Sequence, residues 1–228
     1  MQPSTRTVNV GIIGLGTVGG GVYRLITTHA ERYRKNLGID LRIARVCNRS
    51  EKRAHELGID PEQFTSDWHD VVSDPSIDIV VEVIGGEHPA TEIFEQSFAA
   101  GKHVVTANKA LLGRHMEKLA AAARAAGVQL RCEASCGGGI PIVNTLEHDL
   151  SGNEVITVAG IVNGTTNYIL SRMAEEGLGY EEVLADAQRL GYAEADPTAD
   201  VDGLDAASKI AILSSIGFAT RITTDDVH

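Results

Sequence analysis

The sequence predicts an α/β protein whose first domain is a doubly wound parallel sheet and whose second domain is a smaller α+β unit. Up to about residue 133, short apolar runs alternate with helical segments, and a glycine-rich turn joins the first run to the first helix. Such alternation forms βαβ units, in which the strands are parallel and helices cover both faces. The alternation stops at residues 134–141, so we expect domains at 1–136 and 137–228.

The elements of the first domain follow from apolar runs of strand length and from apolar residues at helical spacing. Strands are expected at Val8–Ile13, Leu41–Cys47, Ile77–Ile84, His103–Thr106 and Val128–Glu133. Helices are expected at Thr17–Arg34, Glu51–Leu57, Pro89–Ala100 and Leu111–Ala126. Gly101 and Gly127 follow two of these helices directly, where glycine commonly ends a helix.

The second domain is expected to be mainly helical. Helices are predicted at Ile142–Leu150, Asn167–Glu176, Tyr180–Leu190 and Gly203–Ala219, with one strand at Glu154–Val162. Because a single strand cannot form a sheet, we expect this domain to be incomplete. Its apolar edge should dimerise with another copy, aggregate or stay mobile. We therefore expect the chain to bind a dinucleotide but to be at best weakly active.

Composition excludes several classes of protein. A net charge of −11 argues against binding to nucleic acid, which requires a basic face. The three cysteines (Cys47, Cys132 and Cys136) give neither a disulfide framework nor a metal-binding spacing. No apolar run approaches the roughly 18 residues of a membrane helix, and the N-terminus lacks the apolar core of a signal peptide. We expect a cytoplasmic protein without a membrane partner.

The glycine-rich turn, Gly14–Gly19, fits the pattern G-x-G-x-x-G between a strand and a helix. In a Rossmann-type dinucleotide site, Gly14 would form the tight turn, Gly16 would let the backbone approach a pyrophosphate, and Gly19 would allow close helix–strand packing. The helix N-terminus would bind the phosphates. The alternative is a glycine-rich loop without a ligand.

The end of the second predicted strand bears on the choice of cofactor. Sites specific for NAD usually carry a carboxylate there, which binds the ribose 2′-hydroxyl. This sequence has no carboxylate between Cys47 and Ser50 but has Arg49, which could bind a 2′-phosphate. The pattern favours NADP, unless Arg49 is only a solvated surface residue.

Two polar segments follow later strands of the predicted sheet. Lys109 ends the run that begins at Val104, so it should lie at the carboxyl edge, where ligands bind. A cation at a helix start opposes the helix dipole, which makes a purely structural role for Lys109 unfavourable. The run Gly137–Gly139 could bind a cation through carbonyl oxygens or serve as a hinge, and both interpretations remain open.

An ionisable pair, Asp205 and Lys209, interrupts an otherwise apolar helix. The two residues are spaced i, i+4 and share a face with Ile212 and Ile216. A partly desolvated lysine can exchange a proton near neutral pH, although the pair could also be a plain salt bridge. The acidic loop just upstream, residues 191–202, could be solvated or could bind an ammonium group.

Taken together, these segments resemble homoserine dehydrogenase. The resemblance is carried by Gly14–Gly20, Val104–Leu112, Glu133–Pro141, Gly160–Tyr168 and Ala187–Lys209, and it extends over essentially the whole chain. The last of these is a family signature. The resemblance implies an NAD(P)-dependent oxidoreductase that interconverts L-aspartate 4-semialdehyde and L-homoserine, on the route to threonine and methionine.

The resemblance also implies roles for individual residues. Lys209 would be the acid/base and Lys109 a second active-site lysine near the nicotinamide. Substrate-binding carboxylates would be Glu194, Asp200 and Asp205. Cofactor contacts would come from Gly14, Gly16, Thr17, Val18, Gly19, Arg49, Lys109 and Gly191. A sodium site made mostly of carbonyl oxygens would involve Glu133, Cys136, Gly138 and Ile140.

This chain departs from the family in its length. The family's catalytic domain continues past His228 and supplies further strands and the dimer interface, and many members add a regulatory domain. Two alternatives therefore remain open: a reductase of a related semialdehyde or imine on the same scaffold, and a non-catalytic nucleotide-binding module.

Overall fold

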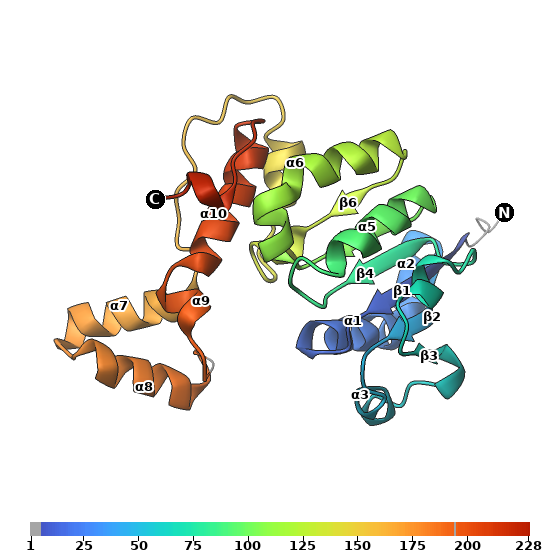
Figure 1. Ribbon diagram of the computed structural model, residues 1–228, viewed down its shortest axis with the longest axis horizontal. Helices are drawn as coiled ribbons and strands as arrows, with labels where there is room; N and C mark the ends of the chain where they lie inside the picture. The colour runs from blue at the N-terminus through green and yellow to red at the C-terminus, as the bar shows by residue number, and fades with distance from the viewer. Residues whose placement is uncertain (1–5, 194) are drawn as a thin grey trace. The chain divides into compact units, whose positions relative to one another are not determined.

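The computed structural model describes residues 6–193 and 195–228. It divides into two compact units. The first unit extends to Leu111 and resumes at Glu117–Ala134, and the second consists of Leu112–Met116 and Ser135–His228. Figure 1 shows both units with most of their helices and strands labelled, and each unit is described separately below.

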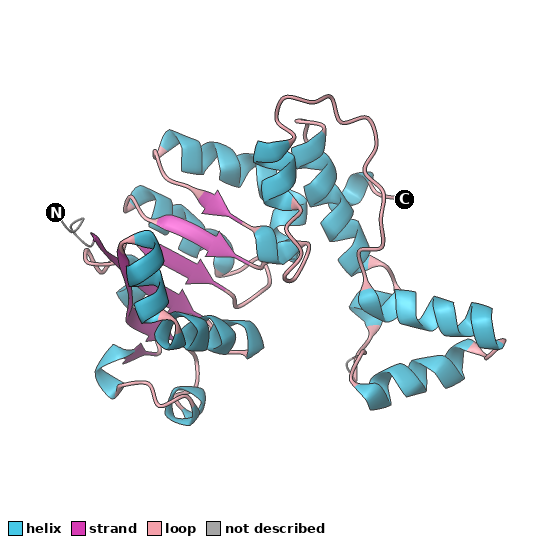
Figure 2. Cartoon of the chain, turned by 180° about the vertical axis from the view of Figure 1, so that it is seen from behind, coloured by secondary structure: helices cyan, strands magenta, loops and turns pink. Residues whose placement is uncertain are grey.

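The first unit is built on a parallel six-stranded sheet of order β3-β2-β1-β4-β5-β6, drawn in magenta in Figure 2. Its strands are β1 (Arg6–Ile13), β2 (Ile39–Cys47), β3 (Phe64–Thr65), β4 (Ile79–Glu82), β5 (His103–Thr106) and β6 (Leu130–Arg131). Ile13 is in register with Cys47 on one side and with Glu82 on the other, so these strands end at one edge. The strand order reverses between β1 and β4, which is where ligands bind in such sheets.

Helices cover both faces of this sheet, as doubly wound topology requires. They are α1 (Thr17–Thr28), α2 (Ala30–Leu37), α3 (Lys52–Glu56), α4 (His69–Val72), α5 (Ala90–Ala99) and α6 (Lys109–Ala125), with a 3₁₀ turn at Pro61–Gln63. On one face, Val10 and Ile12 pack with Val22 of α1. Neighbouring strand residues point to opposite faces, and the space beside Gly11 is filled by Val71 of α4. The predicted fold class of this unit is confirmed.

The predicted single helix Thr17–Arg34 is wrong, because His29 separates α1 from α2 with φ −106° and ψ 14°. The Thr27 hydroxyl near this break donates to the carbonyls of Tyr23 and Arg24. Such bonding to the preceding turn destabilises and bends a helix. β3 and α4 were not predicted from the sequence, because they are too short to produce a recognisable period.

The second unit is helical in its described residues. It contains α7 (Gly164–Glu176), α8 (Tyr180–Leu190), α9 (Thr198–Val201) and α10 (Leu204–Gly217), together with short turns at Thr145–Asp149 and Thr224–Asp226. Ile169, Val183 and Ala187 form a small core between α7 and α8. Left-handed glycines, Gly177 and Gly191, end these two helices.

One expectation for the second unit is wrong. The predicted strand Glu154–Val162 forms no strand among the described residues, and Ile156 and Ile161 are 83% and 77% exposed. Alternating apolar residues produce a strand only where a partner strand supplies hydrogen bonds. No partner strand for this stretch is found among the described residues. The predicted helix Ile142–Leu150 is present over residues 143–149, and its part Thr145–Asp149 is π-helical.

No helix in the described part of the chain is long and apolar enough to cross a membrane.

Candidate functional site

The glycine-rich loop of the first unit has a physical requirement for glycine at two positions. Gly14 has φ +105°, and a Cβ there would lie 2.8 Å from the Val83 carbonyl oxygen. A Cβ on Gly19 would lie only 1.8 Å from the Gly14 oxygen. Gly16 differs, because a Cβ there would meet no atom within 4 Å. The loop is therefore tightly packed behind Gly14 and open beside Gly16.

The start of α1 suits an anionic ligand. Gly16 is the N-cap residue and provides no side-chain acceptor, and the first turn of the helix has no acidic residue. Thr17 and Val18 are exposed. The N–H groups of this first turn have no partner within an α-helix and carry partial positive charge, so they can bind a phosphate.

The end of β2 is tied to the same loop. The Asn48 side chain accepts from Leu15 N at 3.3 Å and donates to the Ser50 carbonyl at 2.9 Å. Arg49 between them is exposed. Burial, followed by the negative charges of Asp67 and Asp70, raises the pKa of the neighbouring Cys47 thiol to about 11. Cys47 is therefore a protonated core residue rather than a nucleophile.

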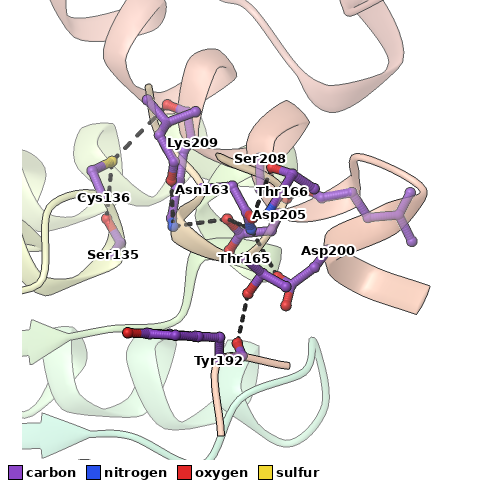
Figure 3. Close-up of polar contacts among 12 residues, drawn as sticks. Ser135, Cys136, Asn163, Thr165, Thr166, Tyr192, Asp200, Asp205, Ser208 and Lys209 are labelled. Atoms are coloured by element: carbon purple, nitrogen blue, oxygen red, sulfur yellow. Dashed lines mark hydrogen bonds and ion pairs between the residues drawn. The ribbon is translucent and has the colours of Figure 1, made fainter. Parts of the chain in front are cut away.

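The second unit contains a buried lysine–carboxylate pair on α10, shown in Figure 3. Lys209 Nζ lies 2.8 Å from Asp205 Oδ2 and donates to the Val162 carbonyl oxygen at 2.8 Å. The side chains are 17% and 3% exposed respectively. The predicted pairing of the two residues is present, and their helix is apolar around them, with Ile212 fully buried.

Asn163 joins the elements of this site, although it was not predicted as a site residue from the sequence. Its amide donates to Asp200 Oδ1 at 2.7 Å and to Asp205 Oδ2 at 2.9 Å. Its oxygen accepts from both the backbone N and the hydroxyl of Thr166, at 2.8 and 2.9 Å. Every donor and acceptor of the Asn163 amide is thus used. The available signal was an asparagine before a helix, a typical N-cap, but the helix was predicted to begin three residues too late.

The geometry gives Lys209 a defined chemistry. An ammonium group has three donors, and two of them are occupied by Asp205 and Val162. The third has no protein acceptor among the described residues. The arrangement can therefore present one N–H of a fixed ammonium group to a bound oxygen atom. Such a group can polarise a carbonyl and transfer a proton.

The other predicted site residues lie in different parts of the chain. Lys109 is the first residue of α6, in the first unit, whereas Lys209 belongs to the second. Asp200 is in α9, and Gly191 is the C-cap of α8 with φ +80°. Glu194 lies outside the described residues.

The glycine run forms a tight turn. Ile140 N donates to the Gly137 carbonyl at 2.6 Å, and Gly139 has φ +100°. Cys136, just before the run, is buried and its sulfur lies 4.0 Å from the Lys209 carbonyl oxygen. The described residues contain no cluster of three His, Cys, Asp or Glu side chains that could hold a metal ion.

Two family models match the chain. The model described as "Homoserine dehydrogenase, NAD binding domain" matches residues 14–133, and the one described as "Homoserine dehydrogenase" matches residues 141–228. The homoserine dehydrogenase of Synechocystis is 48% identical over 221 residues, covering 97% of this chain and 51% of that protein. The Bacillus subtilis homoserine dehydrogenase is 44% identical over 222 residues, again covering 97% and 51%.

Solved structures agree with these matches. A homoserine dehydrogenase from Thiobacillus denitrificans is 46% identical with a TM-score of 0.90, covering 96% of this chain and 51% of that one. A hyperthermophilic archaeal homoserine dehydrogenase in complex with NADPH is 26% identical with a TM-score of 0.83, covering 97% and 75%. The chain spans about half the length of the curated relatives that it matches. The resemblance carried by its motifs is confirmed, and the chain belongs to the homoserine dehydrogenase family.

Proposed function

We propose that this chain provides the dinucleotide-binding and lysine-bearing parts of an enzyme that interconverts L-aspartate 4-semialdehyde and L-homoserine. The observation that carries the proposal is the Lys209 ammonium group, held by Asp205 and the Val162 carbonyl with one N–H left for a substrate oxygen. Membership of a family whose named relatives are homoserine dehydrogenases supports the choice of substrate.

Lys209 acts as the acid and base in this proposal. When bound, a nicotinamide cofactor supplies a hydride to the aldehyde carbon. The third N–H of Lys209 donates to the aldehyde oxygen, polarises the carbonyl, and transfers its proton as that oxygen gains negative charge. In the reverse direction, neutral Lys209 accepts the hydroxyl proton of homoserine. Asp205 keeps the Nζ atom in place in both directions.

The carboxylates of the site are proposed to have two different partners, Lys209 and the substrate. Asp205 is 4% exposed and is occupied by Lys209 and Asn163, so in our proposal it influences substrate mainly through Lys209. Asp200 uses Oδ1 to accept from Asn163, and Oδ2 has no donor among the described residues. We assign Asp200, with Glu194, to the α-ammonium group of the substrate.

The cofactor is proposed to be NADP in preference to NAD. The open backbone at Gly16, the unpaired start of α1 and the tight packing at Gly14 and Gly19 fit a pyrophosphate. Arg49 is exposed where an adenosine 2′-phosphate would lie, and an archaeal relative was solved with NADPH. Thr17, Val18, Lys109 and Gly191 complete the proposed set of cofactor contacts.

Three further properties are proposed from the resemblance. A sodium ion would be held at Glu133, Cys136, Gly138 and Ile140, mostly by carbonyl oxygens. The protein would act as a homodimer or higher oligomer in the cytoplasm. It would act on a small molecule rather than on nucleic acid, in keeping with its net charge of −11.

The proposal is tested by following NADP reduction with L-homoserine, in this chain and in a longer protein that adds the remaining half of a relative. Turnover in the longer protein supports it, and absence of turnover there with either NADP or NAD contradicts it. Equal kcat in both proteins would show that this chain already holds a complete catalytic unit.

Cofactor preference is tested by Arg49→Ala. Losing charge-assisted hydrogen bonds to a phosphate should weaken NADPH binding by about tenfold or more, because each contributes about 1.5–3 kcal/mol. NADH, which lacks the 2′-phosphate, is the internal control and should bind the variant as it binds the unchanged chain. Tighter binding of NADH than of NADPH, unaffected by the substitution, would contradict the preference.

A further inference from the structure

Glu82 is a buried carboxylate to which the proposed chemistry gives no role. It is the last residue of β4, and none of its surface is exposed. Oε1 accepts from Ile84 N at 2.9 Å and from Gly85 N at 3.3 Å. Oε2 accepts from the Thr106 hydroxyl at 2.7 Å. Two backbone donors and one hydroxyl therefore stabilise this carboxylate.

The contacts continue from Thr106 to the start of α6. Thr106 is the last residue of β5 and is 1% exposed. Its hydroxyl accepts from Asn108 N at 2.9 Å, so its proton is directed to Glu82. Asn108, which is 4% exposed, donates from Nδ2 to the Gly86 carbonyl at 2.7 Å and accepts from Leu111 N at 3.2 Å. We call Glu82, Thr106 and Asn108 the edge network.

The edge network fixes two segments at the carboxyl edge of the sheet. One is the loop at residues 84–86, which is exposed and has left-handed φ values of +74° at both Gly85 and Gly86. The other is the first turn of α6, which begins with Lys109. Stability alone does not require a carboxylate here, because well-packed apolar groups are often at least as favourable as buried charges.

The position of the loop identifies the part of the cofactor that it would contact. Val83, next to the loop, lies close to Gly14. A Cβ on Gly14 would be 2.8 Å from the Val83 carbonyl oxygen. The adenosine half of a dinucleotide lies at the end of β2, and the molecule crosses the point where strand order reverses. Its nicotinamide half therefore reaches the ends of β4 and β5, which the edge network holds.

We infer that Glu82, Thr106 and Asn108 are positioning residues for the nicotinamide half of the cofactor. Being completely buried, Glu82 cannot touch the ligand and acts through the loop at residues 84–86. Through Asn108, the same contacts set the first turn of α6 and hence the backbone of Lys109. The inference rests on the proposed function, since it requires a bound nicotinamide dinucleotide.

The test compares two ligands in the 228-residue chain. NADPH contains both halves of the cofactor, whereas adenosine 2′,5′-bisphosphate contains only the adenosine half. Thr106→Val keeps the side-chain shape but removes the hydroxyl, and Thr106→Ser restores it. Thr106→Val should weaken NADPH binding about tenfold, or about 1.4 kcal/mol, because the loop at residues 84–86 and the first turn of α6 would lose the hydroxyl that joins them. Thr106→Ser should bind NADPH within about twofold of the unchanged chain.

Binding of adenosine 2′,5′-bisphosphate should be the same in all three proteins, and this also reports that the variants are folded. Equal weakening of both ligands by Thr106→Val would mean a merely structural role and would overturn the inference. Unchanged NADPH binding in Thr106→Val would overturn it as well. If the unchanged chain binds neither ligand, the proposed function fails, and the inference falls with it.

Discussion

Glu82 in the first unit and Asp205 in the second are both buried carboxylates, but the protein stabilises them in different ways. Glu82 accepts only from neutral donors, two backbone N–H groups and one hydroxyl. Asp205 faces the Lys209 ammonium group and the Asn163 amide. The partners of Glu82 carry no charge, whereas Lys209 has an ammonium group that can donate a proton to a bound oxygen atom. The first arrangement suits a fixed scaffold, and the second suits proton transfer.

The largest effect should follow from removing the charged partner, Lys209. Lys209→Ala should lower kcat by about a hundredfold to ten-thousandfold, the usual range for loss of a general acid or base. The dissociation constant of NADPH should stay unchanged, because the glycine-rich loop lies on other elements. The measurement uses a protein that includes the remaining half of a relative. Retention of more than about a tenth of kcat would show that Lys209 is not the acid/base.

A steric clash would test the close packing of α1 against the glycine-rich loop in the first unit. A Cβ at Gly19 would lie 1.8 Å from the Gly14 oxygen, so α1 must move away from the loop in Gly19→Ala. We expect a loss of unfolding free energy of about 1–3 kcal/mol and clearly weaker NADPH binding. Gly21→Ala is the matched control in the same helix, because a Cβ there meets no atom within 4 Å.

Gly21→Ala should keep NADPH affinity and gain up to about 1 kcal/mol from helix propensity. Similar NADPH affinities in the Gly19 and Gly21 variants would mean that the tight packing at Gly19 does not shape the cofactor loop.

Amide substitutions compare the two carboxylates directly. Glu82→Gln places an NH₂ group against the Thr106 hydroxyl and should cost about 1–3 kcal/mol of unfolding free energy in urea. Asp205→Asn should cost less, about 1 kcal/mol, because Lys209 is 17% exposed and can turn toward water. The order should reverse for kcat, which Asp205→Asn should lower more. If Asp205→Asn were the more destabilising change and left kcat intact, the distinction between scaffold and proton-transfer pair would be wrong.

The last prediction concerns the dependence of stability on pH. The pKa of the buried Cys47 thiol is about 11 in the folded chain, against a reference value of 9.0. Between these pH values, the Cys47 thiol loses its proton in the unfolded chain but keeps it in the folded chain. The contribution of Cys47 to the unfolding free energy is therefore complete below pH 9 and is lost as the pH rises toward 11. The loss should approach about 2 kcal/mol. Urea unfolding across this range should show a shallower fall in Cys47→Ala, and the same slope in both proteins would contradict the assignment.

The sequence predicted most of the first unit because its signals are local. β5 was predicted to the residue, and the spacing of Gly14, Gly16 and Gly19 identified a loop whose backbone needs glycine. The Asp205–Lys209 pair was also accessible, because residues four apart on a helix share a face. The edge network could not be predicted in this way. Glu82 and Thr106 are 24 residues apart, and they meet only because β4 pairs in parallel with β5. Asn108 follows Thr106 by two residues.

Segments that depend on partners were predicted poorly. The stretch from Glu154 to Val162 has the composition of a strand, but strand geometry requires hydrogen bonds from a neighbour, and composition does not supply one. Asn163 was missed for a related reason. It was treated as part of a motif, while its role depends on Asp200 and Asp205, which lie 37 and 42 residues later.

The carbonyl of Val162 has a consequence for how assembly and chemistry are linked. It holds Lys209 at 2.8 Å, and it belongs to the end of the apolar stretch that has no strand partner among the described residues. A strand that pairs with this stretch would restrict the carbonyl and therefore restrict the ammonium group that it holds. The coupling free energy between the two events is reciprocal. Any ligand that orders Lys209 must therefore favour pairing of the stretch by the same factor.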